Sequence, residues 1–205
     1  MKNKIFTLLR HGKVEGEAAL YGNTDVVLSL QGRGQLENAI EKVHAEFVID
    51  NIAASPLLRC AIAAREFSEK YQIPLQLDPQ LKEMHFGAWD GIPFAAMDSQ
   101  WQQLEAFWAS PFLTHPPEGE TLATFAERVI GAWQNLITKD SGQHTLIVCH
   151  GGVIRVILAH ILQIDWRNAN LFKQLHIDFA STTRIEVGDY EGALPVVKWI
   201  GAVST

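Results

Sequence analysis

The chain has little cysteine, no surplus of basic residues and no long apolar run. Cys60 and Cys149 are its only cysteines, and no Cys/His spacing typical of zinc sites accompanies them, so the sequence favours neither a disulfide framework nor a zinc centre. The net charge of -6 argues against nucleic-acid binding, which depends on excess Lys and Arg. No apolar run approaches the roughly 20 residues of a membrane span, and the run at 5–9 is too short for a signal peptide. We therefore expect a cytoplasmic protein with neither nucleic acid nor membrane as a partner.

Apolar runs with strand character alternate with segments of helical period. Apolar residues recur every three or four positions over 36–47, 57–67 and 122–137, and a further apolar helix is expected over 153–162. Ser55 and Pro56 are expected as the N-cap and first residue of the helix that follows the second strand. This alternation predicts an α/β fold, a three-layer sandwich in which a mostly parallel central sheet carries helices on both faces. The expected strands occupy 5–9, 47–54, 146–149, 183–187 and 196–200.

The region 86–119 interrupts this alternation. It is rich in proline and in large aromatic residues, among them Trp101 and Trp108. A small helical cap inserted into the α/β core accounts for this composition. We therefore expect a single domain over 1–205 with a cap or lid over about 86–119.

Three of the predicted strand regions are followed by charged residues and glycines. Arg10-His11-Gly12 follows the first strand, Arg59 comes shortly after the second, and His150-Gly151-Gly152 follows the run at 146–149. Ligands of open α/β sheets bind at the carboxyl ends of the strands. Guanidinium groups match phosphate geometry, glycines allow close backbone approach, and a histidine beside a fixed cation can attack phosphorus. Together these strand ends predict a site for phosphoryl transfer.

Phosphoryl transfer also requires an acid for the leaving oxygen. Residues 81–91 supply three candidates, Glu83, His85 and Asp90. A carboxyl group beside the apolar Phe86 and Trp89 is expected to have a raised pKa and to stay protonated until it is needed. The residues alone do not favour one candidate over the others.

Ordered motifs run along nearly the whole chain. They are Leu9-Arg10-His11-Gly12, Tyr21-Gly22-Asn23-Thr24-Asp25, Leu28-Ser29 with Gly32 and Gln35, Ser55-Pro56-Leu57-Leu58-Arg59, Glu83 with Phe86-Gly87 and Trp89, Pro117-Glu118-Gly119-Glu120-Thr121, and His150-Gly151-Gly152-Val153-Ile154-Arg155. In this order they resemble the histidine phosphatase superfamily, also called the phosphoglycerate mutase-like proteins.

The resemblance implies a phosphoglycerate mutase-like fold and covalent catalysis in two steps, with no metal or cofactor. It implies that His11 is the nucleophile, which becomes phosphorylated, and that Glu83 is the proton donor that later activates water. It also implies that Arg10, Arg59 and His150 form the phosphate pocket.

One segment departs from the pattern of that family. Its members usually follow Arg-His-Gly with Glu-Thr and, a few residues later, with an asparagine that contacts phosphate, whereas this chain has Lys13-Val14-Glu15-Gly16-Glu17. Asn23 in the next loop is a candidate to replace that asparagine. Glu15 and Glu17 are expected to be solvated, because burying an unpaired charge is costly. Beside Arg10 and Arg59, we expect substrate contacts from Tyr21, Gly22, Asn23, His85 and Gly151.

Within the family, the length of the chain and the Leu20-Tyr21 step resemble the alpha-ribazole 5'-phosphate phosphatases of cobalamin assembly. We therefore expect a metal-independent phosphomonoesterase with a small-molecule substrate, its cap aromatics facing the benzimidazole-like base. The alternatives are a broad-specificity sugar-phosphate or nucleotide phosphatase, a phosphoglycerate mutase, and a catalytically inactive protein that binds a phosphate ligand. The sequence does not predict the oligomeric state.

Overall fold

The computed structural model describes residues 3–139 and 142–203, and its centre is a single sheet. The strands are β1 (Lys4–Arg10), β2 (Asn51–Ala54), β3 (Leu75–Leu77), β4 (His144–Cys149), β5 (Thr182–Val187) and β6 (Val196–Ala202). They form a 6-stranded sheet in the order β3-β2-β4-β1-β5-β6. The neighbours from β3 to β1 pair in parallel, and β5 is antiparallel to both β1 and β6.

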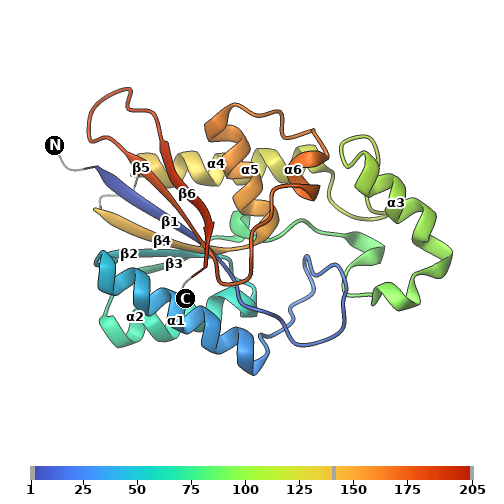
Figure 1. Cartoon of the computed structure of the whole chain (residues 1–205), viewed down its shortest axis with the longest axis horizontal. Helices are drawn as coiled ribbons and strands as arrows, with labels where there is room; N and C mark the ends of the chain where they lie inside the picture. The colour runs from blue at the N-terminus through green and yellow to red at the C-terminus, as the bar shows by residue number, and fades with distance from the viewer. Residues whose placement is uncertain (1–2, 140–141, 204–205) are drawn as a thin grey trace.

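Helices cover both faces of this sheet (Figure 1). The helices α1 (Leu30–Glu46) and α2 (Leu58–Tyr71) lie on one face, and α4 (Leu122–Lys139) and α5 (Gly151–Leu162) lie on the other. Because successive strand residues point to opposite faces, Phe6 and Leu8 pack in the core under α4 and α5, whereas Leu9 packs in the core under α1 and α2. The predicted three-layer α/β fold with a mostly parallel sheet is confirmed. Within the described residues, no helix is long and apolar enough to span a membrane.

The register of the sheet brings three strand ends together. In the parallel pairs, Arg10 lies opposite Cys149 and Ala54 lies opposite Val148. The residues that follow β1, β2 and β4 therefore leave the same edge of the sheet side by side. Gly12 is packed so closely there that a Cβ added to it would lie 1.9 Å from the carbonyl oxygen of Gly32 in α1.

Two local predictions around β2 were wrong. The strand expected over 47–54 covers only Asn51–Ala54, because α1 continues to Glu46 and Phe47 is its C-cap. The helix expected to begin at Pro56 begins at Leu58, and Leu57 rather than Ser55 is its N-cap. The carboxylate of Asp25 accepts a hydrogen bond from the Leu58 backbone nitrogen at 2.6 Å, so a distant loop supplies the acceptor for the first turn of α2.

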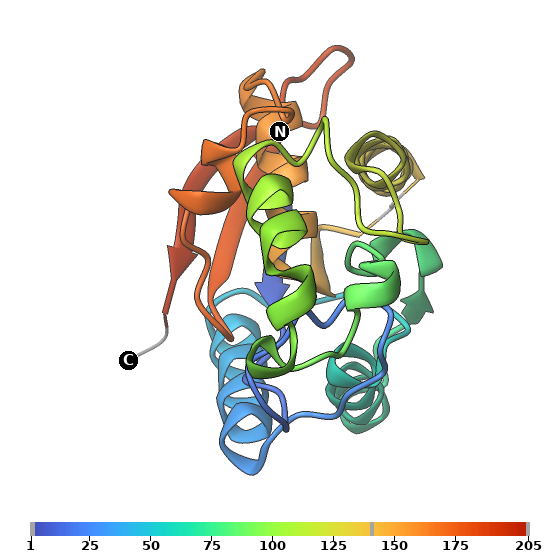
Figure 2. The ribbon, with the colours of Figure 1, turned by 90° about the vertical axis from the view of Figure 1, so that its right-hand side faces the viewer.

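The proline-rich region beyond Phe86 contains no strand among its described residues. It lies beyond the carboxyl ends of the strands, and Figure 2 shows α3 (Trp101–Ala109) in front of them. Leu104 and Phe107 of α3 are buried against the core under α4 and α5. The division into a core and a cap over 86–119 stays a prediction. The other short elements are η1 (Pro79–Leu81), η2 (Gly87–Trp89), η3 (Phe94–Ala96), η4 (Asp98–Gln100) and α6 (Asn170–Lys173).

Candidate active site

His11 is buried at the end of β1 and is held in one tautomer. Its ring nitrogen Nδ1 lies 2.8 Å from the carbonyl oxygen of Gly12. A carbonyl only accepts hydrogen bonds, so Nδ1 carries the proton and Nε2 keeps its lone pair. Burial, together with the charges of Arg59 and Arg10, lowers the pKa of His11 to about 3. The ring is therefore neutral near neutral pH and has a nitrogen able to attack phosphorus.

Arg10 carries a donor that no group in the described chain satisfies. Its Nη1 donates to the carbonyl oxygen of Ile177 at 2.5 Å, and its guanidinium lies 4.0 Å from the centre of the Phe179 ring. Its Nε is buried and has no hydrogen-bond partner among the described residues. A Cβ added to Gly151, the first residue of α5, would lie 3.4 Å from this nitrogen. A buried N–H without an acceptor is costly, and this N–H is available to donate to an anion bound at the start of α5.

Arg59 is fully buried and holds the loop that follows residue 20. Its Nη1 donates to Thr24 O at 2.9 Å, and its Nη2 donates to Tyr21 O at 2.9 Å and to Gly22 O at 2.7 Å. Burial lowers the pKa of the guanidinium, although nearby acidic groups oppose this effect. The third nitrogen of the guanidinium, Nε, bonds to His150 instead of to the loop.

Asp90 binds the backbone N–H groups of the same loop. Its two carboxylate oxygens accept hydrogen bonds from the backbone nitrogens of Gly22, Asn23 and Thr24 at 3.1, 2.7 and 3.0 Å. Burial acts to raise the pKa of Asp90, but the hydrogen bonds outweigh it and leave that pKa lowered. Asp90, one of the three candidate acids, therefore uses both of its carboxylate oxygens to bind the loop. The backbone nitrogens of Gly22 and Asn23, two of the predicted substrate-contact residues, already donate to Asp90.

His150 links the strand ends of β2 and β4. Arg59 Nε donates to His150 Nδ1 at 3.3 Å, so the proton lies on Nε2, which is 2.8 Å from the hydroxyl oxygen of Ser55. Ser55 Oγ also accepts from the backbone nitrogen of Leu57, the N-cap of α2, at 3.4 Å. The centres of the His150 and His11 rings are 5.1 Å apart, and burial followed by the charge of Arg59 holds the pKa of His150 well below its usual range.

Glu83 reaches the same place from a segment outside the helices and strands. Its Oε2 accepts from Gly152 N at 3.0 Å and its Oε1 from Met84 N at 3.1 Å. A Cβ on Gly152 would lie 2.3 Å from Oε1, so glycine is needed there to admit the carboxyl group. His85, the third candidate acid, accepts from Gly87 N at 3.3 Å and lines a different hollow from the one that Gly152 lines. Of the three candidates, Glu83 is the one that contacts the start of α5.

Arg155 is a third guanidinium at the site, and the sequence alone indicated no role for it. Its Nε donates to Leu175 O at 2.8 Å, and its Nη1 would lie 3.0 Å from a Cβ on Gly151. Burial lowers its pKa, and the charge of Glu83 opposes that effect. A signal was present, because positions 151 and 155 are four apart and lie on one face of a helix.

An apolar cavity of about 240 Å³ opens beside Glu83, Gly152 and Arg155. Trp108 contributes to its wall, whereas Trp101 packs behind Trp108 with ring centres 5.6 Å apart. The other lining residues are mainly aromatic or aliphatic and come from the loop after β1, from Met84, from the proline-rich region, and from α4 and α6: Leu20, Met84, Phe86, Phe107, Pro111, Leu122, Phe125, Phe172 and Lys173.

The remaining predicted contact residues lie at the rim. Tyr21 donates its hydroxyl to Glu17 O at 2.9 Å, and the side chains of Glu15 and Glu17 are exposed, as expected. Asn23 and His85 both line an open hollow of about 540 Å³ on the other side of Glu83. Whether Asn23 replaces the missing asparagine stays a prediction.

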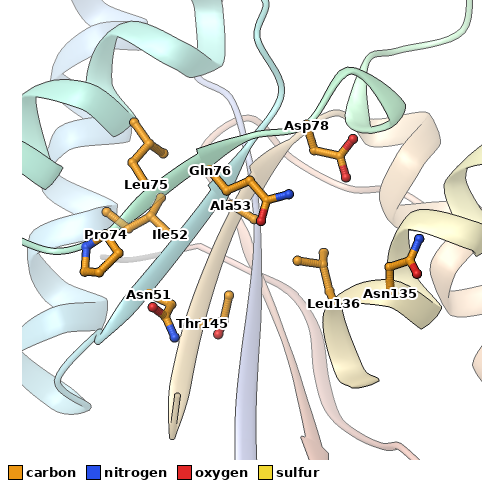
Figure 3. A pocket seen from close by; sticks show the side chains of 10 residues that line it. All are labelled: Asn51, Ile52, Ala53, Pro74, Leu75, Gln76, Asp78, Asn135, Leu136 and Thr145. Atoms are coloured by element: carbon orange, nitrogen blue, oxygen red, sulfur yellow. The ribbon is translucent and has the colours of Figure 1, made fainter. Parts of the chain in front are cut away.

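A further cavity, of about 370 Å³, lies at the β3 edge of the sheet (Figure 3). Gln76 and Asp78 of the β3 edge and Asn135 of α4 line it, but no histidine, cysteine or arginine does. It offers neither the nucleophile nor the cations that the strand ends provide. No group of three or more His, Cys, Asp or Glu side chains in residues 3–139 and 142–203 is arranged to hold a metal ion.

Known proteins resemble this chain along most of its length. It is 27% identical to a glucosyl-3-phosphoglycerate phosphatase of Mycolicibacterium vanbaalenii, over 97% of this chain and 93% of the relative. It is 31% identical to an adenosylcobalamin/alpha-ribazole phosphatase of Salmonella typhimurium, over 76% of this chain and 78% of the relative. Among solved structures, Bacillus stearothermophilus YhfR superposes with a TM-score of 0.87 at 26% identity, and the match covers 98% of each chain.

The sequence profile of the histidine phosphatase superfamily (branch 1) matches residues 6–200. This range contains the three strand ends, Glu83 and the cavity beside it. The chain belongs to the histidine phosphatase superfamily.

Proposed function

We propose that this protein is a metal-independent phosphomonoesterase that acts through a phosphohistidine at His11. The observation that carries the proposal is the pairing of a neutral His11, whose Nε2 is free, with the buried and unpartnered Nε of Arg10. The first is a nucleophile and the second is a donor for a phosphoryl oxygen. The phosphatase names of relatives that align over most of the chain support the same activity.

In the first step, Nε2 of His11 forms a bond to phosphorus while the ester P–O bond breaks. Glu83, in its acid form, gives its proton to the leaving oxygen, so the product is a neutral alcohol. In the second step, the Glu83 carboxylate takes a proton from water, the water oxygen bonds to phosphorus and the N–P bond breaks. Free phosphate leaves and His11 is neutral again.

Rapid quenching of the wild-type protein with a 32P-labelled phosphomonoester tests the covalent step. We expect acid-labile, base-stable label on the protein during turnover, and no label on the His11→Ala variant. Undiminished hydrolysis by His11→Ala would overturn the proposal. Phosphate transfer between positions of a sugar acid would identify a mutase, and absence of turnover with every ester would identify a binding protein.

For the leaving group, we propose alpha-ribazole, so that the substrate is alpha-ribazole 5'-phosphate. The cavity beside Glu83 supports this assignment, because Phe86, Phe107 and Trp108 offer flat apolar surfaces for an aromatic base. The 31% identity to the Salmonella typhimurium protein supports it as well.

A second candidate substrate is an ester of a sugar acid such as glucosyl-3-phosphoglycerate. Arg155 favours it, because its guanidinium lines the cavity, where a carboxylate of the leaving group would find a partner. Steady-state kinetics with both esters and with simple sugar phosphates decide between them. A preference for alpha-ribazole 5'-phosphate of less than about tenfold in kcat/KM, which is about 1.4 kcal/mol of transition-state binding, would overturn the assignment.

A further inference from the structure

A bidentate and largely buried ion pair joins Arg128 of α4 to Glu120, which lies just before that helix. Arg128 Nε lies 2.7 Å from Glu120 Oε1, and Nη2 lies 2.9 Å from Oε2. The side chains are only 18% and 12% exposed. Two parallel bonds between a planar guanidinium and a planar carboxylate fix the orientation of both groups. The pair is therefore a rigid feature beside α4.

This pair also binds the backbone that carries Glu83. The guanidinium of Arg128 donates to the carbonyl oxygens of Gln80, Lys82 and Glu83 at 2.6, 2.9 and 3.0 Å. One guanidinium thus joins α4 to three carbonyls within four residues of chain.

Glu120 completes the attachment from the other side of Glu83. Its Oε2 accepts from the backbone nitrogen of His85 at 3.3 Å. Residues 83–86 belong to no helix or strand, so ladder hydrogen bonds do not hold them in place. The bonds from Arg128 and to Glu120 take over that role on both sides of the candidate acid.

Glu83 is consequently fixed at both ends. Its carbonyl oxygen is bound by Arg128 of α4, while its carboxylate is bound by the nitrogen of Gly152 at the start of α5. We infer that Arg128 and Glu120 are positioning residues, which hold Glu83 where it can protonate the leaving oxygen. This inference rests on the proposed function, because it takes Glu83 as the acid.

Two aromatic esters of similar shape provide the test. The alkoxide released from p-nitrobenzyl phosphate needs a proton, whereas the phenolate released from p-nitrophenyl phosphate leaves without one. The ratio of kcat/KM for the two esters reports proton donation in the first step. A loss of folded protein lowers both values equally and leaves the ratio unchanged.

We expect Glu83→Gln to lower kcat/KM for p-nitrobenzyl phosphate by about 10²–10⁴-fold, and for p-nitrophenyl phosphate far less. Arg128→Ala should change the ratio in the same direction by about tenfold or more. Arg128→Lys, which cannot bind both Glu120 oxygens and all three carbonyls, should lie between Arg128→Ala and the wild type. Glu120→Gln keeps the side-chain shape and serves if Arg128→Ala does not fold.

Arg184→Ala is the matched control. Arg184 is a buried arginine in the middle of β5, where it packs 3.7 Å from the Phe47 ring centre on the α1 side of the sheet. Its loss should lower stability and leave the ratio unchanged. If Glu83→Gln changes the ratio but the Arg128 and Glu120 variants do not, the positioning role is overturned while the proposed function stands. If Glu83→Gln leaves the ratio unchanged, Glu83 is not the acid, and the acid step and the positioning role fail together.

Discussion

The carboxylate of Asp90 provides a direct test of how the 21–24 loop is held. Four backbone N–H groups point at its two oxygens, those of Gly22 and Thr24 at Oδ1 and those of Asn23 and Phe86 at Oδ2. Asp90→Asn keeps the shape but replaces one oxygen with an NH2 group. In either orientation of the amide, two N–H donors lose their acceptor and face another donor.

The magnitude follows from these contacts. A hydrogen bond to a charged group contributes about 1.5–3 kcal/mol, so the loss of two sets an upper range of about 3–6 kcal/mol. Asp90 is half-buried, and water can replace part of what is lost, so we expect the free energy of unfolding to fall by about 2–4 kcal/mol. Activity should fall as well, because Arg59 binds the carbonyls of the same loop.

Urea unfolding of the wild type and of Asp90→Asn measures this difference by linear extrapolation. Because hydrogen bonds outweigh burial and lower the folded-state pKa of Asp90 below its ordinary value of 3.8, its stabilisation is complete above that value and is lost as the pH falls through the lower folded-state pKa. The difference should therefore be constant from about pH 5 to pH 8. Asp165→Asn, which breaks an exposed pair with Arg167, should change the free energy of unfolding far less, because water screens that pair. A loss below about 1 kcal/mol for Asp90→Asn, or a difference that varies across that pH range, would refute the reasoning.

Three further predictions concern the site itself. NMR titration of the His11 ring should show a neutral imidazole with its proton on Nδ1 from about pH 5 to pH 8, because burial and the two arginines hold its pKa near 3; a midpoint near 6.5 would contradict this. Arg155→Met should raise KM by about tenfold for esters with an anionic leaving group and much less for neutral ones, and equal effects on both would show that Arg155 does not contact the leaving group. Gly152→Ala should lower kcat/KM by at least about tenfold, because the new Cβ would lie 2.3 Å from a Glu83 oxygen. The control is Gly131→Ala, at a position on α4 where the new Cβ would meet open space. It should leave activity unchanged and raise the free energy of unfolding by about 0.5–1 kcal/mol.

The sheet and its main helices could be predicted from the sequence because their signals are local. Apolar residues at helical spacing located α1, α2 and α4, and an apolar stretch located α5. The runs that became β1 and β4 end just before Arg10-His11 and His150. Parallel strands end at a common edge, so this local pattern was enough to bring the two histidines together.

The contacts that select among candidate groups were not predictable, because they join residues far apart in sequence. The residues alone did not rank Glu83, His85 and Asp90, and only the family resemblance favoured Glu83. In the structure, Asp90 binds the nitrogens of residues 22–24, which lie more than 60 positions earlier. Ser55 is a further case, because its hydroxyl contacts His150 across 95 positions, whereas the sequence around it indicated only a helix start. A single sequence indicates the contacts that a side chain makes with its neighbours along the chain, but not the contacts that it makes with residues far away in sequence.

The three arginines at the site show why a protein of net charge -6 can still present a strongly cationic pocket. Arg10, Arg59 and Arg155 are secured by backbone carbonyls, among them those of Ile177 and Leu175, and none of the three forms an ion pair within the described residues. A carbonyl oxygen fixes a guanidinium in place without neutralising it, whereas a carboxylate would cancel the charge that phosphate must meet. Glu83, Asp25, Asp90 and Asp178 lie close enough to raise the pKa of Arg10 or Arg59 without forming an ion pair with them among the described residues, and Glu83 is the carboxylate held at the start of α5. The three guanidinium groups are thus ordered before any substrate arrives, and fixed charges of this kind need no reorganisation when they meet a phosphoryl dianion, which is what the proposed function requires.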